Sequence, residues 1–489
     1  MTGKNSLHAA ALLLTAAALL CAVSCGSEAA EKPADTTEAL HTETQENSTE
    51  TETRYTAKIP EGTDLGGKPF RIMVYNEDNP VWYDVDFNAV EETGETINDA
   101  VFQRTRAAEE QLHFKLERYP VADYGKTALS TSVQAADDAY DAGFVYTRGV
   151  FPLAEEGMLL DMNEVPGLQL DAPWWDQNER TQLSVAGKLF MLTGDISIMY
   201  RKSLRVVYYN KALAADYDVV NPYELIDNGR WTLEAFLSMC RNVSKDLDGD
   251  GKMGAADQYG LVYSVDTITL GLVASDVKFA DKDADDLPVL SLYNTRTMDV
   301  WNKYTSILFD TSIAANCTHE NWNGTDMFAQ NLGLFACIEL HNTEKLRGMV
   351  SDFGILPMPK YDEAQKDYHV TINPHCAAML VIPVTNSDPA KTALVLDVLG
   401  AESKNTLTPA YYDVYLKGKS ARDDESQVSL DIIFNSIRYD IGYCYDWAGY
   451  ASLPLRLITD LNPNFVSEYE KIAKDAEAQM QTTIDSFLG

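Results

Sequence analysis

The chain has 489 residues, with 74 Asp and Glu against 39 Lys and Arg, and its formal net charge at pH 7 is -35. The acidic residues are spread along the whole chain and no basic stretch stands out, so the composition argues against a nucleic-acid-binding protein. Residues 57–489 are enough for two domains or for one large body with two lobes.

Residues 1–24 have the pattern of a secretory signal peptide. An apolar run from Ala9 to Ala22 is long enough for a signal-peptide core and short for a membrane span. The run ends in AVSC followed by Gly26, which resembles a bacterial lipobox with Cys25 as the lipidated first residue of the mature chain. We therefore expect a protein held by lipid at the extracytoplasmic face of the cell membrane. An ordinary signal peptide cleaved nearby is the alternative.

Residues 25–56 are rich in Thr and Glu and almost free of large apolar side chains. A segment of this composition buries too little surface to offset the entropy lost on ordering. We expect residues 25–56 to be a disordered tether between the lipid and a folded body at 57–489.

Strands and helices alternate in the first part of this body. The patterns predict strands at 70–74, 113–119 and 140–147, and a helix that begins at Asn98 and ends near Leu112. Strand, helix and strand in this rhythm imply parallel strands joined by right-handed crossovers. Ligands of such sheets bind beyond the carboxyl ends of the strands. The loops at 75–82 and 145–151 are therefore candidate ligand-binding loops.

The middle of the chain predicts a second group of elements. Thr232 is the expected N-cap of a helix whose buried stripe contains Leu233, Phe236, Cys240 and Val243. Further strands are predicted at 258–264, 353–360 and 376–384, and an amphipathic helix at 389–403.

Residues 246–257, DLDGDGKMGAAD, have the spacing of a calcium-binding loop. Asp246, Asp248 and Asp250 stand at positions one, three and five, and a glycine follows at six. Lys252 offers its carbonyl at seven, and Asp257 closes the loop at twelve, where Glu is usual. We expect a structural Ca²⁺ site away from the ligand. A solvated turn without metal is the alternative, and a calcium sensor would need a second loop.

Several segments together resemble the bacterial extracellular solute-binding proteins of family 1, which deliver sugars to ABC transporters. Besides the lipobox and tether, the matching pieces are YDAGFVYTRGVFPLAEEGMLLDM, LSVAGKLFMLTGDIS, VVYYNKAL, NPYELIDNGRWTLEAF, DLDGDGKMGAADQYGL and FGILPMPK, in that order. Phe190 is a departure, because the family usually has Tyr at this position.

The resemblance implies an α/β fold of the periplasmic-binding-protein type (type 2). Each lobe would be a mostly parallel sheet flanked by helices, with the ligand cleft at the hinge. We place the first lobe at about 57–190 and 300–380, and the second at about 191–299 and 381–489. The resemblance implies a monomer that captures a carbohydrate, expected to be an oligosaccharide, and delivers it to the permease of an ABC importer. No cofactor is required for this work.

Aromatic and polar side chains in the predicted loops are the candidate ligand-binding residues, because a sugar presents a flat C–H face and several hydroxyls. The candidates are Asn76, Glu77, Tyr146, Arg148, Trp174, Trp175, Asp195, Trp322 and Trp447. The alternatives are core packing for the aromatic residues, a surface ion pair for Arg148 and turn capping for Asp195.

A surface-anchored carbohydrate-active enzyme, such as a glycosidase, is the main functional alternative. Its chemistry needs two carboxylates that flank the scissile bond, and 74 acidic residues leave this alternative open. The sequence has no nucleophile elbow, zinc-binding helix or phosphate-binding loop. A dockerin would carry two calcium loops in a short repeat, whereas this chain has one. The identity and length of the ligand are left open.

Overall fold

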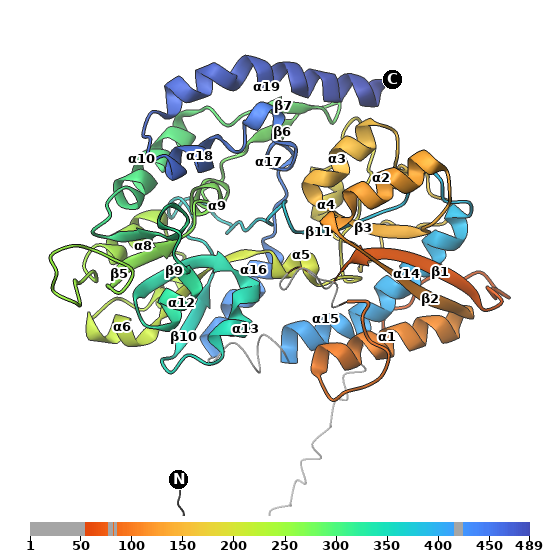
Figure 1. Ribbon diagram of the computed structural model, residues 1–489, viewed down its shortest axis with the longest axis horizontal. Helices are drawn as coiled ribbons and strands as arrows, with labels where there is room; N and C mark the ends of the chain where they lie inside the picture. The colour runs from red at the N-terminus through yellow and green to blue at the C-terminus, as the bar shows by residue number, and fades with distance from the viewer. Residues whose placement is uncertain (1–53, 77–81, 83–85, 415–423) are drawn as a thin grey trace, which may run out of the picture. The chain divides into compact units, whose positions relative to one another are not determined.

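The computed structural model describes residues 54–76, 82, 86–414 and 424–489 (Figure 1). Cys25, Glu77 and almost the whole predicted tether lie outside these residues, so the lipid anchor stays a prediction. Residues 54–489 form one compact unit. In the part of the chain that the structure describes, no helix is both long and apolar enough to cross a membrane.

Two sheets define the two lobes (Figure 1). The first has the order β11-β3-β1-β2 and consists of β1 (Lys68–Tyr75), β2 (Phe114–Val121), β3 (Ala142–Tyr146) and β11 (Ala378–Val381). The second has the order β10-β4-β9-β5-β8 and consists of β4 (Arg205–Asn210), β5 (Tyr259–Tyr263), β8 (Ala314–Asn316), β9 (Gly333–Glu339) and β10 (Phe353–Leu356). A hairpin of β6 (Ala280–Lys282) and β7 (Pro288–Leu290) stands apart from both.

The pairing follows the predicted alternation of strands and helices. β1 is parallel to β2 and β3, and β5 is parallel to β8 and β9. β11 joins β3 in the antiparallel sense, as do β9 and β10 with β4. The parallel strands of each sheet therefore end at one common edge, where polar loops can meet a ligand.

Helices cover the first sheet through an apolar core. They are α1 (Thr96–Leu112), α2 (Lys126–Ala135), α3 (Thr147–Glu155), α4 (Gln177–Gln182), α14 (Pro389–Asn405) and α15 (Leu407–Pro409), with the short turns η1 (Asp123–Gly125) and η2 (Met162–Glu164). Phe70 and Ile72 of β1 share one buried cluster with Leu112 of α1 and Leu396 of α14. The predicted start of the first helix is wrong, because α1 begins at Thr96 and the amide of Asn98 donates to the carbonyl of Glu91 at 2.8 Å.

The second sheet has its own set of helices. They are α6 (Lys211–Asp216), α7 (Pro222–Asp227), α8 (Leu233–Cys240), α9 (Thr267–Ala274), α10 (Thr295–Leu308), α11 (Cys317–Glu320), α12 (Gly324–Ala329), α13 (Thr343–Leu346), α16 (Asp424–Asn435) and α18 (Leu453–Thr459), with the turn η3 (Leu340–Asn342). The predicted cap of α8 is confirmed, since Thr232 Oγ1 accepts the N–H of Ala235. The predicted stripe from Leu233 to Val243 is fully buried.

The predicted limits of the lobes are wrong in two places. Residues 314–356 contain β8, β9 and β10, which belong to the second sheet rather than the first. Residues 389–405 form α14, which packs in the first lobe rather than the second. The chain thus returns to the first sheet at β11. A short apolar strand carries no sequence signal for the sheet that it joins, which explains the error.

Several segments connect the lobes. α5 (Met199–Lys202) lies on the first crossing, and on later crossings Val370 donates to Ser436 at 3.0 Å while Arg438 donates to Val370 at 2.7 Å. α17 (Ile441–Tyr445), η5 (Trp447–Gly449) and the long α19 (Phe465–Leu488) follow. Figure 1 shows α19 running across the top of both lobes, and the rings of Phe190 and Phe487 stack at 5.3 Å.

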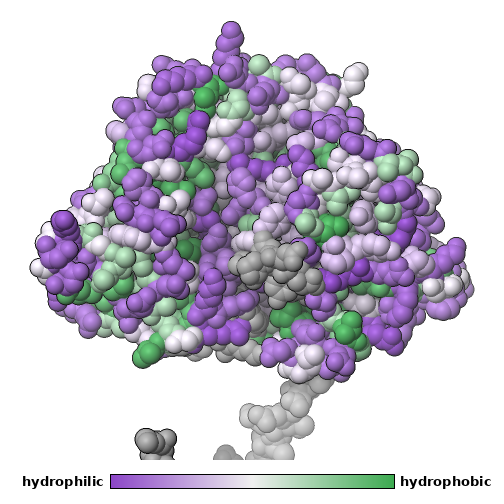
Figure 2. Space-filling view, viewed as in Figure 1, coloured by the Kyte–Doolittle hydropathy of each residue, from purple (hydrophilic) through white to green (hydrophobic). Residues whose placement is uncertain are grey.

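Hydrophilic side chains dominate the face seen in Figure 2, and the hydrophobic ones form small separate groups. Isolated surface apolar residues are normal for a soluble domain, so this face gives no reason to expect a broad apolar interface.

Candidate functional site

Three tyrosines gather at the carboxyl edge of the first sheet. Tyr75 and Tyr146 end β1 and β3, and Tyr124 lies in η1 just after β2. The ring centroids of Tyr75 and Tyr124 are 5.1 Å apart, and those of Tyr124 and Tyr146 are 6.2 Å apart. Tyr75 is buried, whereas Tyr124 and Tyr146 are partly exposed. The first lobe therefore presents an aromatic edge.

The matching edge of the second sheet holds a recess of about 520 Å³ at the carboxyl ends of β5, β8 and β9. Its lining is Tyr263, Ser264, Cys317, Thr318, Asn321, Trp322, Asn323, Gly324, Thr325, Ile338, Glu339, His341 and Asn342. Hydroxyl and amide groups dominate this set, and the Trp322 ring is partly exposed beside them. We call this feature the second-lobe recess.

An ion cluster underlies the second-lobe recess. Arg205, the first residue of β4, donates to Ser264 Oγ at 2.6 Å and to Asp266 Oδ2 at 2.8 Å, and it also donates to Glu339. Burial alone would lower the pKa of Arg205, but the two carboxylates raise it above its ordinary value. Burial alone would raise the pKa of Glu339, but Arg205 outweighs it and the pKa is lowered. Both groups are therefore ionised at neutral pH.

Two contacts connect the recess with the first lobe. Trp82, from the segment after β1, packs edge-on against His341 with ring centroids 4.8 Å apart. Cys376, on the crossing segment before β11, lies in the electrostatic range of Tyr75 on one side and Glu339 on the other, and burial and that carboxylate raise the pKa of its thiol. We call the region between the aromatic edge and the second-lobe recess the interlobe cleft, since the Trp82–His341 contact brings the first lobe next to the recess.

Three predicted ligand-binding residues lie at this cleft. Tyr146 is part of the aromatic edge, and Trp322 lines the second-lobe recess. Asn76 follows Tyr75 directly and donates its backbone N–H to Val121 at 3.0 Å. Direct contact of these side chains with a ligand stays a prediction.

The two adjacent tryptophans belong to the core of the first lobe instead. Trp174 and Trp175 are both 3% exposed. Their indole N–H groups donate to the same oxygen, Oδ1 of Asp397 in α14, at 3.1 and 3.0 Å. Their hydrogen-bonding groups and ring faces are used inside the protein, so the prediction that they line the cleft is corrected to core packing.

Trp447 is also a core residue. Its ring is 4% exposed and stacks on Tyr445 at 4.7 Å, and its indole N–H donates to Thr483 Oγ1 at 3.0 Å. These partners fix the C-terminal helix α19 against η5. The prediction of a ligand contact at Trp447 is therefore corrected as well.

The charged candidates Arg148 and Asp195 have partners within the chain. Arg148 pairs with Asp446 at 2.8 Å, which is an ion pair between distant segments rather than a surface pair. Asp195 is buried and accepts from Arg201 at 3.0 Å, Thr408 at 2.8 Å and Lys404 at 3.0 Å. Its carboxylate therefore fastens the first crossing to the end of α14 and does not face the cleft.

Sequence reasoning missed the groups that build the recess, above all Arg205, Glu339 and His341. A signal existed for one of them, because the rule that ligands bind at carboxyl ends of parallel strands also applies to the second sheet. β5 ends at Tyr263 and β9 at Glu339, so Ser264 and Glu339 satisfy that rule.

The acidic loop is folded as a compact turn in the second lobe. One carboxylate oxygen from each of Asp246, Asp248 and Asp250 lies within 4.8 Å of the others. Asp257 is separate from this group, since it is buried and accepts the N–H groups of Leu247 at 2.8 Å and Gly254 at 2.7 Å. Three close carboxylates fit a hard cation such as Ca²⁺. Calcium binding stays a prediction.

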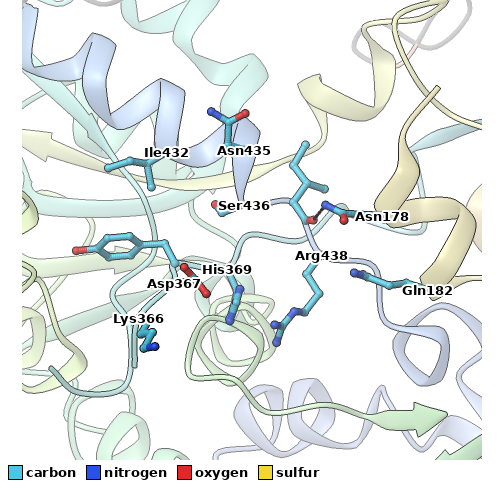
Figure 3. A pocket seen from close by; sticks show the side chains of 11 residues that line it. Asn178, Gln182, Lys366, Asp367, His369, Ile432, Asn435, Ser436 and Arg438 are labelled. Carbon is cyan, nitrogen blue, oxygen red and sulfur yellow. Dashed lines mark hydrogen bonds between the residues drawn. The ribbon is translucent and has the colours of Figure 1, made fainter. Parts of the chain in front are cut away.

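A second recess, of about 440 Å³, lies at the hinge between α4 of the first lobe and residues 366–369 and 432–438 (Figure 3). Arg438 and His369 point to the same side in Figure 3, and Arg438 pairs with Asp276. From α4, Asn178 donates to the Ile437 carbonyl at 3.3 Å and Gln182 accepts the N–H of Tyr439 at 2.7 Å. The polar groups of this second recess therefore hydrogen-bond or form ion pairs within the protein, where they stabilise the contact between the lobes.

Comparison with known proteins supports the fold. No family model matches the chain, and no curated protein matches it significantly. Among solved structures, the ABC substrate-binding protein Lmo0181 from Listeria monocytogenes in complex with cycloalternan has a TM-score of 0.54 and 14% identity, over 86% of this chain and 99% of that chain.

Two further solved structures match over a similar span. UgpB from Mycobacterium tuberculosis in complex with glycerophosphocholine has a TM-score of 0.54 and 16% identity, over 79% of this chain and 95% of that chain. A cyclo/maltodextrin-binding protein complexed with maltotetraose has a TM-score of 0.55 and 11% identity, over 85% and 97%. The chain therefore has the two-lobed α/β fold found in ABC-transporter solute-binding proteins, as predicted.

Proposed function

We propose that this protein is a solute-binding protein of family 1 that captures a carbohydrate between its lobes and delivers it to an ABC importer. It acts as a monomer without a required cofactor. Lipidation of Cys25 holds it at the extracytoplasmic face of the membrane, and residues 25–56 give it reach. The shared fold and the sequence pieces quoted above support this proposal.

One observation carries the proposal: an aromatic edge of the first lobe faces the same region as a polar recess of the second lobe, which contacts Trp82 of the first. Tyr124 and Tyr146 offer ring faces from the first lobe, and Trp322 offers one from the second. The hydroxyl and amide groups of the second-lobe recess can pair with sugar hydroxyls. A pocket that combines apolar faces with a few fixed polar groups is typical of sites for small ligands.

The carboxylates of the cleft argue against a glycosidase. A general acid in such an enzyme needs a raised pKa, and its partner carboxylate must stand across the scissile bond. Glu339 and Asp266 instead share one guanidinium, that of Arg205, and the pKa of Glu339 is lowered. This pair is therefore suited to binding rather than to proton donation.

Thermal unfolding of residues 54–489 with neutral mono- and oligosaccharides tests the proposal. A ligand that binds only the folded state raises the Tm by mass action. We expect one oligosaccharide to raise the Tm without being degraded, and Trp322→Ala to abolish the shift. Tyr293→Ala, which removes an exposed ring of the same lobe outside the recess, should keep it. Degradation of the sugar would favour the enzyme instead.

The anchor needs a separate test. Wild-type protein expressed with its own leader should incorporate a radiolabelled fatty acid and fractionate with membranes. Cys25→Ser should lose both properties. Labelling that persists in Cys25→Ser would rule out this residue as the site of lipidation.

A further inference from the structure

The second-lobe recess exposes negative charge and hides positive charge. Glu339 lines it with a side chain 17% exposed, and Asp266 beside it is 21% exposed. The guanidinium of Arg205, which neutralises one of these two carboxylates, is only 6% exposed. A ligand that enters the recess therefore meets a carboxylate before it meets the cation.

The rest of the lining adds no positive charge. Among the described residues that line the recess there is no Lys or Arg. His341 does not compensate, since burial lowers its pKa to about 4 and the imidazole is neutral at pH 7. Lys202, whose charge lies near His341, is 7% exposed and pairs with Glu344 at 3.5 Å. Among the residues of the recess that the structure describes, no accessible cation is thus available to an anionic ligand.

We infer that the cleft selects uncharged or cationic carbohydrates and rejects anionic ones, such as uronates and sulfated or phosphorylated sugars. This inference rests on the proposed function and adds the charge of the ligand to it. A carboxylate or sulfate in the recess would lose its water without gaining the charge-assisted hydrogen bonds that normally repay that loss. It would also lie beside Glu339, and like charges in a partly buried site repel strongly.

Matched sugars that differ only in charge test the inference. The probes are maltotetraose, cellotetraose and mannotetraose, each with a counterpart in which one C6 hydroxymethyl group is oxidised to a carboxylate. Titration calorimetry with residues 54–489 measures all six. We expect any tetrasaccharide that binds to lose at least tenfold in affinity on oxidation. The loss should shrink at about 1 M salt, where the Debye length is about 3 Å.

Glu339→Gln assigns the effect to the recess. This change keeps the shape of the side chain and removes the charge, so the difference between each neutral sugar and its oxidised counterpart should become at least threefold smaller. Glu320→Gln is the matched control, because Glu320 is an exposed acid of the neighbouring α11 that does not line the recess. It should leave the difference unchanged.

The outcomes separate the inference from the proposed function. Equal or tighter binding of an oxidised tetrasaccharide would overturn the inference and leave carbohydrate binding intact. The inference would also be overturned if the difference in affinity between neutral and oxidised sugars were the same in Glu339→Gln and in wild type. Failure of all six sugars would count against carbohydrate binding itself, and the inference would fall with it.

Discussion

Arg148 and Asp446 form an ion pair at 2.8 Å although 298 positions separate them in the sequence. The two side chains are 14% and 15% exposed, and Arg148 also donates to the carbonyl of Tyr443 at 3.0 Å. Asp446 in turn accepts the N–H of Ser452 at 2.8 Å. The pair joins α3, which follows strand β3 of the first sheet, to the C-terminal segment that carries α18 and α19.

Arg148→Met should destabilise the protein by about 1–3 kcal/mol, because it leaves a shielded carboxylate with fewer partners. Urea unfolding of residues 54–489 measures this change. Arg230→Met is the matched control, since Arg230 pairs with Glu363 at 3.5 Å between side chains that are 63% and 70% exposed. The control should change stability by less than about 0.5 kcal/mol. Equal effects of the two substitutions would contradict this role of Arg148.

Asp440 should make stability depend on pH. Burial raises its pKa to about 6, although its carboxylate accepts the N–H groups of Phe279 at 2.7 Å and Tyr443 at 3.0 Å. A raised pKa means that the folded state holds the proton more tightly, so the stabilising contribution present at low pH is lost as pH rises from about 4 to about 6.

Urea unfolding of wild type and Asp440→Asn between pH 4 and pH 7 checks this dependence. Asparagine has no proton to lose, so the variant should gain stability relative to wild type as pH rises, by up to about 3 kcal/mol. Asp460→Asn is the matched control for loss of a carboxyl, because Asp460 is exposed. A difference between Asp440→Asn and wild type that stays constant across the range would refute the assignment.

Calcium should stabilise the loop at 246–257. We expect Ca²⁺ to raise the Tm of residues 54–489 and to release or absorb measurable heat on titration. Asp248→Ala should remove both effects, because it deletes one of the three close carboxylates. Asp283→Ala, in the turn of the β6–β7 hairpin, removes an acid of a similar turn and should keep both. Absence of heat and of any Tm shift in wild type would end the calcium prediction.

Substitution of a core tryptophan should lower stability and leave sugar affinity unchanged, whereas substitution of a cleft tryptophan should mainly lower sugar affinity. Trp174→Phe removes a buried indole N–H that donates to Asp397 and should cost about 1–3 kcal/mol of stability while leaving sugar affinity unchanged. Trp322→Ala should weaken sugar binding with a smaller effect on stability. Unfolding and calorimetry on both variants separate the roles. A loss of sugar affinity in a stably folded Trp174→Phe variant would indicate that Trp174 contacts the ligand.

Local patterns were enough to predict several elements of the fold. Alternating apolar residues gave the first three strands, and the Thr232 cap with its stripe gave α8. The spacing of Asp246, Asp248 and Asp250 also predicted that their carboxylates come together. These features depend on residues that are close in the sequence, so they can be predicted from one sequence alone.

The site depends on distant partners, and that part was mostly missed. Trp174 looks like an exposed loop residue until Asp397, 223 positions later, accepts its indole N–H. Arg205 and Glu339 are 134 positions apart and meet only because β4 and β9 pair. Sequence patterns report side-chain type and local period, whereas burial and ion pairing are decided by which strands become neighbours.

The distribution of tryptophans has a consequence for spectroscopy. The chain has seven, and five of them, Trp174, Trp175, Trp231, Trp301 and Trp447, are at most 4% exposed. The other two, Trp82 and Trp322, are partly exposed, and both lie at the interlobe cleft. We therefore expect the five buried indoles to supply a constant background of fluorescence, and the emission of Trp82 and Trp322 to change when a solute binds at the cleft. Intrinsic fluorescence would then report occupancy of the proposed site without an added dye.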